Sequence, residues 1–196
     1  MQKLLMVSLM SATLMLSGCA GLLVGGAVVG TAAAVSTLHD RRTPGTVVDD
    51  RNLELVISKK ILGNQFINTH SHSNLTIYNG VVLVTGEAAN AKVKNDIINL
   101  VRSTANVKAV REDIAIMPNS SLLSRSNDSA ITTKVKTALL SLDLPNFDPT
   151  LLNVSTERGK VYLMGLVTRL EAEAIIDRVR RVRGVLSVTD VFEYIQ

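Results

Sequence analysis

The chain has 196 residues, of which 21 are Lys or Arg and 17 are Asp or Glu, so its formal net charge is +4. This excess is too small to predict a nucleic-acid partner, and it is compatible with contact to anionic lipid headgroups. The single cysteine excludes an intramolecular disulfide, and the length fits one medium domain or two small ones.

The first 18 residues have the pattern of an export signal. Lys3 is followed by an apolar run over residues 4–16 that contains no acidic residue. This run is shorter than the roughly 18 residues that a membrane-spanning helix needs, and a basic start before a short apolar run is typical of a signal peptide. We therefore predict that residues 1–18 are removed on export.

The signal ends in the sequence Leu16-Ser17-Gly18-Cys19, where small residues precede the cysteine. This junction resembles a bacterial lipobox, which implies acylation of Cys19 and attachment to a membrane. The alternative is an ordinary signal peptide followed by a stray buried cysteine. Because Ala20 and not Asp follows the cysteine, analogy with lipoprotein sorting implies the outer membrane, with the chain lipid-anchored at the periplasmic face.

Residues 19–48 have the composition of a lipid-anchored tether. Residues 20–35 are small and apolar, but they are rich in glycine and too few to span a bilayer. Residues 36–48 include Pro44-Gly45 and have the composition of an irregular linker.

The rest of the chain is an internal repeat. The pattern Asp50-x-x-Leu53-x-x-x-Ile57 recurs 78 residues later as Asp128-x-x-Ile131-x-x-x-Val135. Later in each copy, the pairs Asn79-Gly80 and Arg158-Gly159 stand between alternating apolar residues, which is a hairpin signal. We predict two domains over residues 49–117 and 127–196, joined by a polar linker over residues 118–126.

Each copy is predicted to form a helix, two strands, a second helix and a closing strand. Asp50 and Asp128 stand just before the apolar period begins, where an N-cap is expected. The spacing of apolar residues predicts second helices over residues 90–103 and 168–183, and the closing strands are expected over residues 107–117 and 185–195.

Paired copies of this order, with Asn-Gly-x-Val hairpins and a closing Val-x-x-Val, resemble BON domains. Two such copies behind a lipobox resemble the dual BON-domain outer-membrane lipoproteins of the DolP type, most specifically over residues 127–135 and 161–168. The resemblance implies an α+β fold with two tandem BON domains, each an αββαβ sandwich with a three-stranded mixed sheet and two helices. It also implies that the second BON domain binds anionic phospholipid, and that the protein helps to maintain outer-membrane integrity.

The sequence contains no pattern of residues that is typical of catalysis. The histidines are His39, His70 and His72, and the His-x-His pair has no Cys, Asp or Glu near it in sequence. The acidic residues are scattered and include no motif typical of a paired general acid and base. We expect a protein that is not an enzyme and that holds no cofactor and no metal.

The candidate lipid contact is the first helix of the second copy. With Ile131 at the centre of the core stripe, Leu140 points outward among threonines and lysines. An outward leucine beside cations fits shallow contact with an anionic membrane. Together with the resemblance, this arrangement predicts the phospholipid-binding residues Ala130, Ile131, Thr133, Lys134, Lys136, Thr137 and Leu140.

The outward position of Leu140 is also compatible with a purely structural role. Leu140 could pack against the first domain or the linker, or be a single exposed leucine, and Leu62 holds the equivalent place in the first copy. Ala130 stands where the DolP-type motif has a tryptophan, the side chain that most favours a membrane interface. A second basic cluster consists of Arg178, Arg180, Arg181 and Arg183. We interpret it first as a solvated helix C-terminus, where cations interact favourably with the helix dipole, and second as an attraction to lipid.

The competing function is a protein–protein adaptor whose BON domains dock an outer-membrane assembly factor or a cell-wall enzyme. An exposed apolar patch would serve either function equally well. Binding to liposomes without the acyl anchor separates the two functions, because a pure adaptor would not bind lipid.

Overall fold

A computed structural model describes residues 40–145 and 147–196 of the chain. The predicted signal peptide, Cys19 and the tether before residue 40 lie outside the described residues. Arg41–Gln196 form one compact unit that contains two layered α+β domains, each with a complete core. Within the described ranges, no helix combines the length and the apolar character needed to cross a bilayer.

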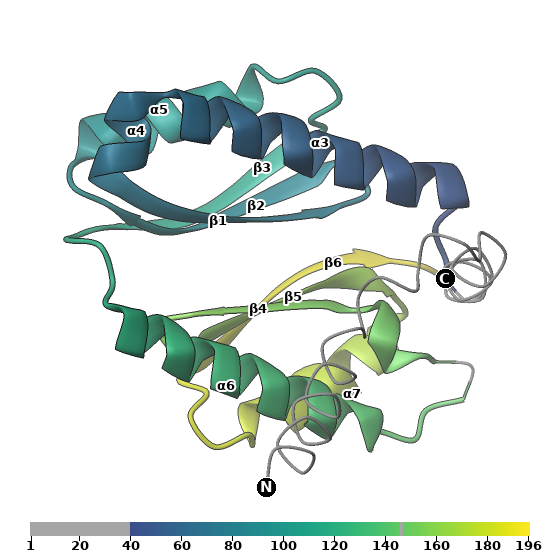
Figure 1. Cartoon of the computed structure of the whole chain (residues 1–196). Helices are drawn as coiled ribbons and strands as arrows, with labels where there is room; N and C mark the ends of the chain where they lie inside the picture. The colour runs from purple at the N-terminus through teal and green to yellow at the C-terminus, as the bar shows by residue number, and fades with distance from the viewer. Residues whose placement is uncertain (1–39, 146) are drawn as a thin grey trace, which may run out of the picture. The chain divides into compact units, whose positions relative to one another are not determined.

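The first domain contains three helices and a three-stranded sheet (Figure 1). In chain order its elements are α3 (Pro44–Gly63), α4 (Gln65–His70), β1 (Ser71–Tyr78), β2 (Val81–Ala88), α5 (Ala91–Arg102) and β3 (Ala109–Ile116). The strands lie in the order β1-β2-β3, with β1 antiparallel and β3 parallel to the central β2.

The second domain repeats this order. Its elements are α6 (Leu122–Leu140), the short 3₁₀ helix η3 (Pro149–Leu151), β4 (Asn153–Glu157), β5 (Lys160–Val167), α7 (Arg169–Arg180) and β6 (Ser187–Tyr194). Its mixed sheet has the order β4-β5-β6. The predicted α+β fold with two αββαβ domains is therefore confirmed, with α4 as an added turn of helix before β1.

The first helix of each domain begins earlier than the apolar pattern predicts. The hydroxyl of Thr43 accepts a hydrogen bond from the backbone N–H of Thr46, so α3 begins at Pro44, inside the predicted tether. Ser121 caps α6 in the same way, and this helix begins inside the predicted linker. A hydroxyl N-cap starts both helices, and in α3 the fixed φ of Pro44 also suits the first helical position.

Asp50 and Asp128 are not N-caps, and this prediction is wrong. Both residues lie within their helices, several positions after the N-terminus, and are buried, at 6% and 5% exposure. Each carboxylate instead accepts two hydrogen bonds from the hairpin turn of its own domain. Asp50 binds the N–H groups of Asn79 and Gly80 at 2.6 and 2.7 Å, and Asp128 binds those of Arg158 and Gly159 at 2.9 and 2.8 Å.

Both hairpin turns occur where the sequence predicts them. The two turn residues of each hairpin have positive φ, at 50° and 77° in the first domain and 51° and 71° in the second. This conformation is typical of a type I′ turn, whose twist matches that of the flanking strands. We call the contact between helix carboxylate and turn the aspartate clamp.

The helices of each domain cover one face of its sheet and enclose an aliphatic core (Figure 1). In the first domain, helix residues Leu53 and Ile57 pack with Val82 and Val84 of the central strand. The second domain encloses the corresponding residues Ile131, Val135, Val161 and Leu163. Because side chains alternate along a strand, the residues between these valines and leucines point to the opposite face of each sheet.

These opposite faces of the two sheets pack against each other. The centre of the contact is a buried cluster of Tyr78, Leu83, Tyr162 and Met164, each at most 3% exposed. The hydroxyl of Tyr162 donates to Asp113 at 2.8 Å, and the hydroxyl of Tyr78 accepts from the backbone N–H of Leu166 at 3.2 Å. The polar ends of both tyrosines are therefore satisfied across the contact.

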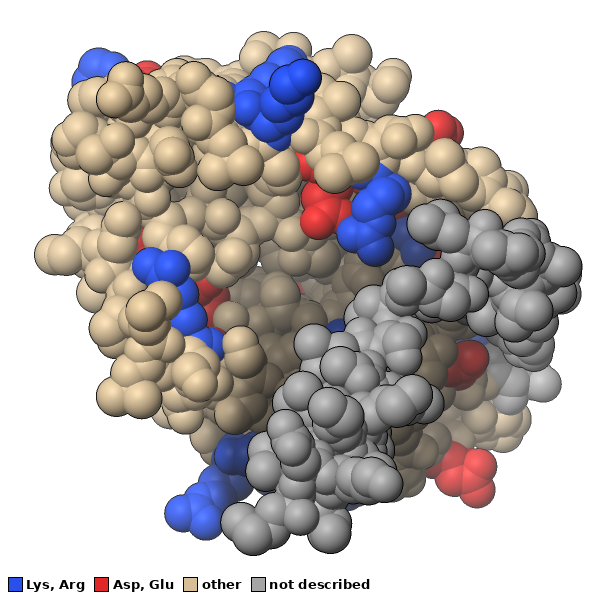
Figure 2. All heavy atoms as spheres, in the orientation of Figure 1, with Lys and Arg blue, Asp and Glu red and all other residues tan. Residues whose placement is uncertain are grey.

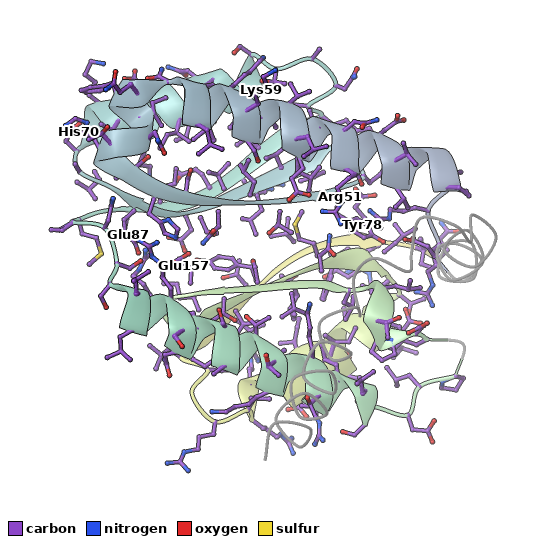
Figure 3. All side chains as sticks on the ribbon, viewed as in Figure 1. Arg51, Lys59, His70, Tyr78, Glu87 and Glu157 are labelled. Carbon is purple, nitrogen blue, oxygen red and sulfur yellow. The ribbon has the colours of Figure 1, made fainter. Side chains whose placement is uncertain are left out.

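Two carboxylates are buried at one end of this contact (Figure 3). Glu87 is 0% exposed and pairs with Arg158 at 3.2 Å, while Glu157 is 2% exposed and accepts a hydrogen bond from the Asn74 amide at 2.6 Å. Burial raises the pKa of Glu157. The Asn74 hydrogen bond works against this rise and the nearby charge of Glu87 adds to it. The ionised form of Glu157 is therefore disfavoured in the folded protein.

The segment just before α3 binds both domains. Arg41 makes a bidentate ion pair with Glu171 of α7, at 2.6 and 2.7 Å, and also donates to the carbonyl oxygen of Leu166. The hydrogen bond from Arg41 is the main reason why the pKa of Glu171 is lowered. Arg42 pairs with Asp50 at 2.9 Å and lies over the Tyr78 ring.

The aspartate clamp predicts a specific loss of stability. Asp128→Ala removes two charge-assisted hydrogen bonds and leaves two turn N–H groups without their acceptor, so it should cost about 2–4 kcal/mol in the free energy of unfolding. Asp128→Asn keeps one acceptor oxygen and should cost roughly half as much. Urea unfolding of both variants checks this. Wild-type stability of Asp128→Ala would show that the turn does not depend on the carboxylate.

The buried Glu157 predicts a dependence of stability on pH. Its folded-state pKa is raised above the ordinary value of 4.5, so the stabilisation by its proton is complete below that value and is lost as the pH rises through the folded-state pKa. Glu157→Gln keeps the acceptor for Asn74 without the charge. It should stabilise the protein at pH 7 on the order of 1 kcal/mol, and the difference should vanish near pH 4.

Thermal unfolding at both pH values measures this difference. Glu173→Gln, at an exposed position on α7, controls for the loss of one surface carboxylate. If Glu157→Gln destabilised the protein at pH 7, the buried carboxylate would be a stabilising group and the assignment would be incorrect.

Candidate lipid-binding surface

Helix α6 buries one stripe and exposes the other side. Ile131, Val135 and Leu139 are at most 2% exposed and belong to the core of the second domain. The prediction of Ile131 as a lipid contact is therefore wrong, because its side chain packs beneath the helix. The other six predicted residues are all exposed: Ala130, Thr133, Lys134, Lys136, Thr137 and Leu140.

Leu140 points outward, as its helical position predicts. Its side chain is 62% exposed, so it is not buried against the first domain or the linker. Leu62, its counterpart on α3, is 65% exposed. An outward leucine at this place is therefore common to both domains and does not by itself distinguish a lipid-binding helix.

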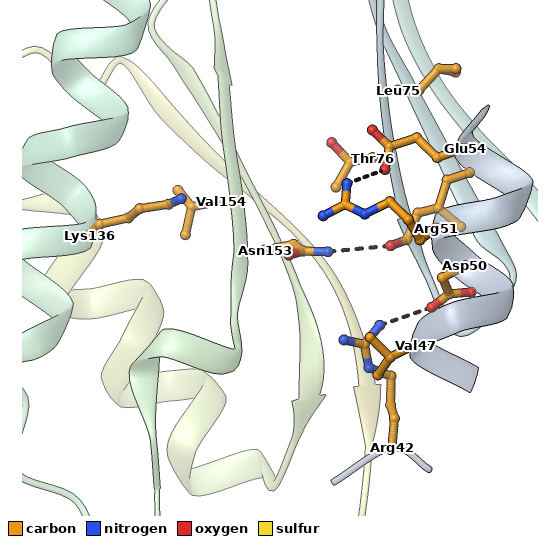
Figure 4. Close-up of a pocket in the computed structure, with 11 residues that line it drawn as sticks. Arg42, Val47, Asp50, Arg51, Glu54, Leu75, Thr76, Lys136, Asn153 and Val154 are labelled. Carbon is orange, nitrogen blue, oxygen red and sulfur yellow. Dashed lines mark hydrogen bonds and ion pairs between the residues drawn. The ribbon is translucent and has the colours of Figure 1, made fainter. Parts of the chain in front are cut away.

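The two predicted lysines lie on different sides of Leu140. Residues two apart on a helix are separated by about 200°, so Lys134 and Lys136 flank the outward face. Lys136 also lines an open groove of about 460 Å³ between the two domains (Figure 4). In that groove Arg42 pairs with Asp50 and Arg51 with Glu54, whereas neither lysine of α6 forms an ion pair within the described part of the chain.

The charge on α6 has one sign at its surface. The helix contains three cations, Arg125, Lys134 and Lys136, and one acid, Asp128, which is buried in the aspartate clamp. An anionic bilayer would therefore meet cations and no exposed carboxylate along the whole helix. On the face drawn in Figure 2, Lys and Arg side chains are separated by uncharged surface and do not form one continuous basic patch.

Helix α3 has a more apolar outer surface with mixed charge. Val48, Leu55 and Leu62 follow each other at intervals of seven residues and are 59–65% exposed. The same helix also carries Asp49 at its surface, and Glu54 in an ion pair with Arg51. Because Arg51, Lys59 and Lys60 are also exposed on α3, its surface charge is of both signs, unlike that of α6. The apolar stripe would suit a protein partner.

The second basic cluster is divided between two roles. Arg178 reaches across to the end of α6, where it donates to the carbonyl oxygen of Ala138 at 3.1 Å and to the Ser141 hydroxyl at 2.6 Å. Arg178 thus satisfies a carbonyl at a helix C-terminus. Arg181 pairs with Asp177 on its own helix at 2.8 Å. No local sequence pattern indicates the contact of Arg178 with α6, because the two helices are distant along the chain.

The two histidines that the structure describes, His70 and His72, lie in different elements. His70 ends α4 and its ring binds the carbonyl oxygen of Phe66, whereas His72 lies in β1. Burial lowers the pKa of His72, and the charge of Arg125 lowers it further. Across the described ranges, no three His, Cys, Asp or Glu side chains gather in a geometry that could hold a metal ion.

Comparison with known proteins identifies the repeat. Residues 49–118 and 127–196 each match the BON domain. The chain is 34% identical over 187 residues to the outer membrane lipoprotein DolP of Haemophilus influenzae, covering 95% of this chain and 94% of that protein. It is 31% identical over 157 residues to a 21 kDa hemolysin of Actinobacillus pleuropneumoniae, covering 80% of each chain.

Solved structures add little to this comparison. A match to CdsD, a structural protein of the type III secretion system of Chlamydia trachomatis, covers 72% of this chain and 91% of that one. Its identity of 10% and TM-score of 0.29 carry no argument. The sequence matches cover both copies of the repeat, and the two copies have the same fold. The chain belongs to the BON-domain family, as a dual-BON protein of the DolP type.

Proposed function

We propose that this protein is an outer-membrane lipoprotein, anchored through Cys19 at the periplasmic face, that binds anionic phospholipid through its second BON domain. In this proposal it helps to maintain outer-membrane integrity and performs no catalysis. The name of the Haemophilus relative, an outer membrane lipoprotein, supports the location. The Leu-Ser-Gly-Cys junction supports the anchor.

The observation that carries the lipid contact is the surface of α6. It presents Leu140 at 62% exposure and two lysines, and its one acid is buried. Each lysine near an anionic surface contributes about 1 kcal/mol, and a leucine that enters the interface adds apolar burial. Arg178, which contacts the end of α6, brings a further cation to the same side of the domain.

A protein–protein adaptor is the second candidate, and α3 is the observation that favours it. Its stripe of Val48, Leu55 and Leu62 is apolar enough for a partner helix, and exposed charges of both signs lie beside it. The two candidates therefore use different helices and can be tested by separate substitutions.

The anchor is tested on the mature protein. Mass spectrometry of its N-terminal peptide should show a diacyl or triacyl cysteine at position 19, and the acyl mass should be absent from the Cys19→Ala protein. A soluble product cut at another position would exclude lipid anchoring.

The lipid contact is tested with residues 40–196, which contain both cores and lack the anchor and the apolar tract. Leu140→Glu places a negative charge where the bilayer should lie. It should therefore weaken binding to phosphatidylglycerol vesicles by about thirtyfold, which corresponds to roughly 2 kcal/mol.

Leu62→Glu is the matched control, because it makes the same change at the equivalent position of α3 with nearly the same exposure. It should leave vesicle binding unchanged. Equal vesicle binding by the wild-type, Leu140→Glu and Leu62→Glu proteins would show that the lipid contact does not use α6. Absence of vesicle binding by the wild-type fragment would favour the adaptor.

A further inference from the structure

Two adjacent leucines at the start of α6 are almost fully exposed. Leu122 and Leu123 form the first turn of the helix and are 80% and 81% exposed. The end of β3 and the connection that follows it also expose Ile116 and Met117, at 57% and 42%. Apolar side chains concentrated on one connection are unusual for a surface that meets only water.

Leu122 lies on the same line along α6 as Leu140. The two residues are 18 positions apart, which is five full turns at 3.6 residues per turn, so their side chains point in the same direction. At 1.5 Å per residue they are about 27 Å apart. The helix therefore has a leucine at each end of a single outward face.

The surface between these leucines is suited to a layer of lipid headgroups. The residues nearest to the line from Leu122 to Leu140 are Ser126, Ser129, Thr133 and Lys136, which offer hydroxyls and a cation. Within residues 122–140, all of which the structure describes, no acid is exposed. The Ser129 and Thr133 hydroxyls donate to the carbonyl oxygens of Arg125 and Ser129, each at 3.0 Å, so they keep the face polar but do not serve as donors to lipid. The Lys136 ammonium can donate to phosphate oxygens, while the leucines at both ends enter the apolar boundary.

We infer that α6 lies flat on an anionic lipid surface with two apolar insertion points, the Leu122–Leu123 pair at its start and Leu140 at its end. This inference rests on the proposed function and extends it to residues inside the predicted linker. Two contacts about 27 Å apart fix the direction of the helix relative to the bilayer, which one leucine cannot do. They also add apolar area on a helix where Ala130 contributes only a methyl group.

The chain contains no tryptophan, so a single introduced tryptophan reports on one position alone. Leu122→Trp, Leu140→Trp and Leu170→Trp are made separately in residues 40–196. Leu170 is the control, because it lies in the first turn of α7 and is 79% exposed. With phosphatidylglycerol vesicles, the emission of the first two proteins should shift to the blue and be quenched by brominated acyl chains, and that of the third should not.

A second measurement uses binding itself. The double variant Leu122→Ser, Leu123→Ser should bind phosphatidylglycerol vesicles roughly tenfold more weakly than the wild type, and Leu170→Ser should bind equally well. Because the replaced side chains are about 80% exposed, the unfolding midpoint should not change, which separates lost binding from lost folding.

The outcomes distinguish the two proposals. A shift at position 140 without a shift at position 122 would overturn the second insertion point and leave the proposed function intact. Absence of vesicle binding by the wild-type fragment would overturn the proposed function and the inference with it. Blue-shifted emission of Leu122→Trp before vesicles are added would show that this end of α6 is already covered in the free protein, and would also overturn the inference.

Discussion

The fold of each domain depends on a carboxylate inside a helix that holds the turn of a hairpin. A type I′ turn directs its backbone N–H groups away from the strand ladder, and here they lie beneath the first helix. Asp50 and Asp128 accept these N–H groups in pairs, so two buried donors and one buried charge satisfy each other. Because the turn is fixed relative to the helix, the register of the central strand against the core is fixed as well.

The register of the central strands β2 and β5 also determines which side chains lie at the contact between the domains. Each has one set of side chains in its own core and the alternate set, which includes Leu83 and Tyr162, between the two sheets. A shift by one residue would exchange these sets, with small valines between the sheets and tyrosine in the core. The contact between the sheets leaves outward residues of both first helices exposed, among them Leu62 on α3 and Leu140 on α6.

Local chemistry makes part of this structure predictable from the sequence. The turns at Asn79-Gly80 and Arg158-Gly159 follow from residue type, and the outward position of Leu140 follows from 100° per residue. The role of Asp50 does not follow from local chemistry, because its carboxylate accepts hydrogen bonds from N–H groups 29 and 30 residues away. From its local sequence alone, an aspartate just before an apolar period is expected to be an N-cap. The start of α6 at Leu122 cannot be predicted either, because serine is common both in linkers and at N-caps. The exposed leucines of its first turn are therefore not predicted as part of a helix.

The ion pairs of Arg41 and Arg42 have a mechanical consequence. Arg41 is tied to Glu171 in the second domain, and Arg42 to Asp50 in the first. Tension applied to the chain ahead of residue 40 therefore reaches both domains together. It acts on these ion pairs before it can unfold α3 from its N-terminal end. Asp50 also accepts the two N–H groups of the hairpin turn, so a load on Arg42 reaches this turn through the same carboxylate. The two domains thus resist a pull as one body, although each has a core of its own.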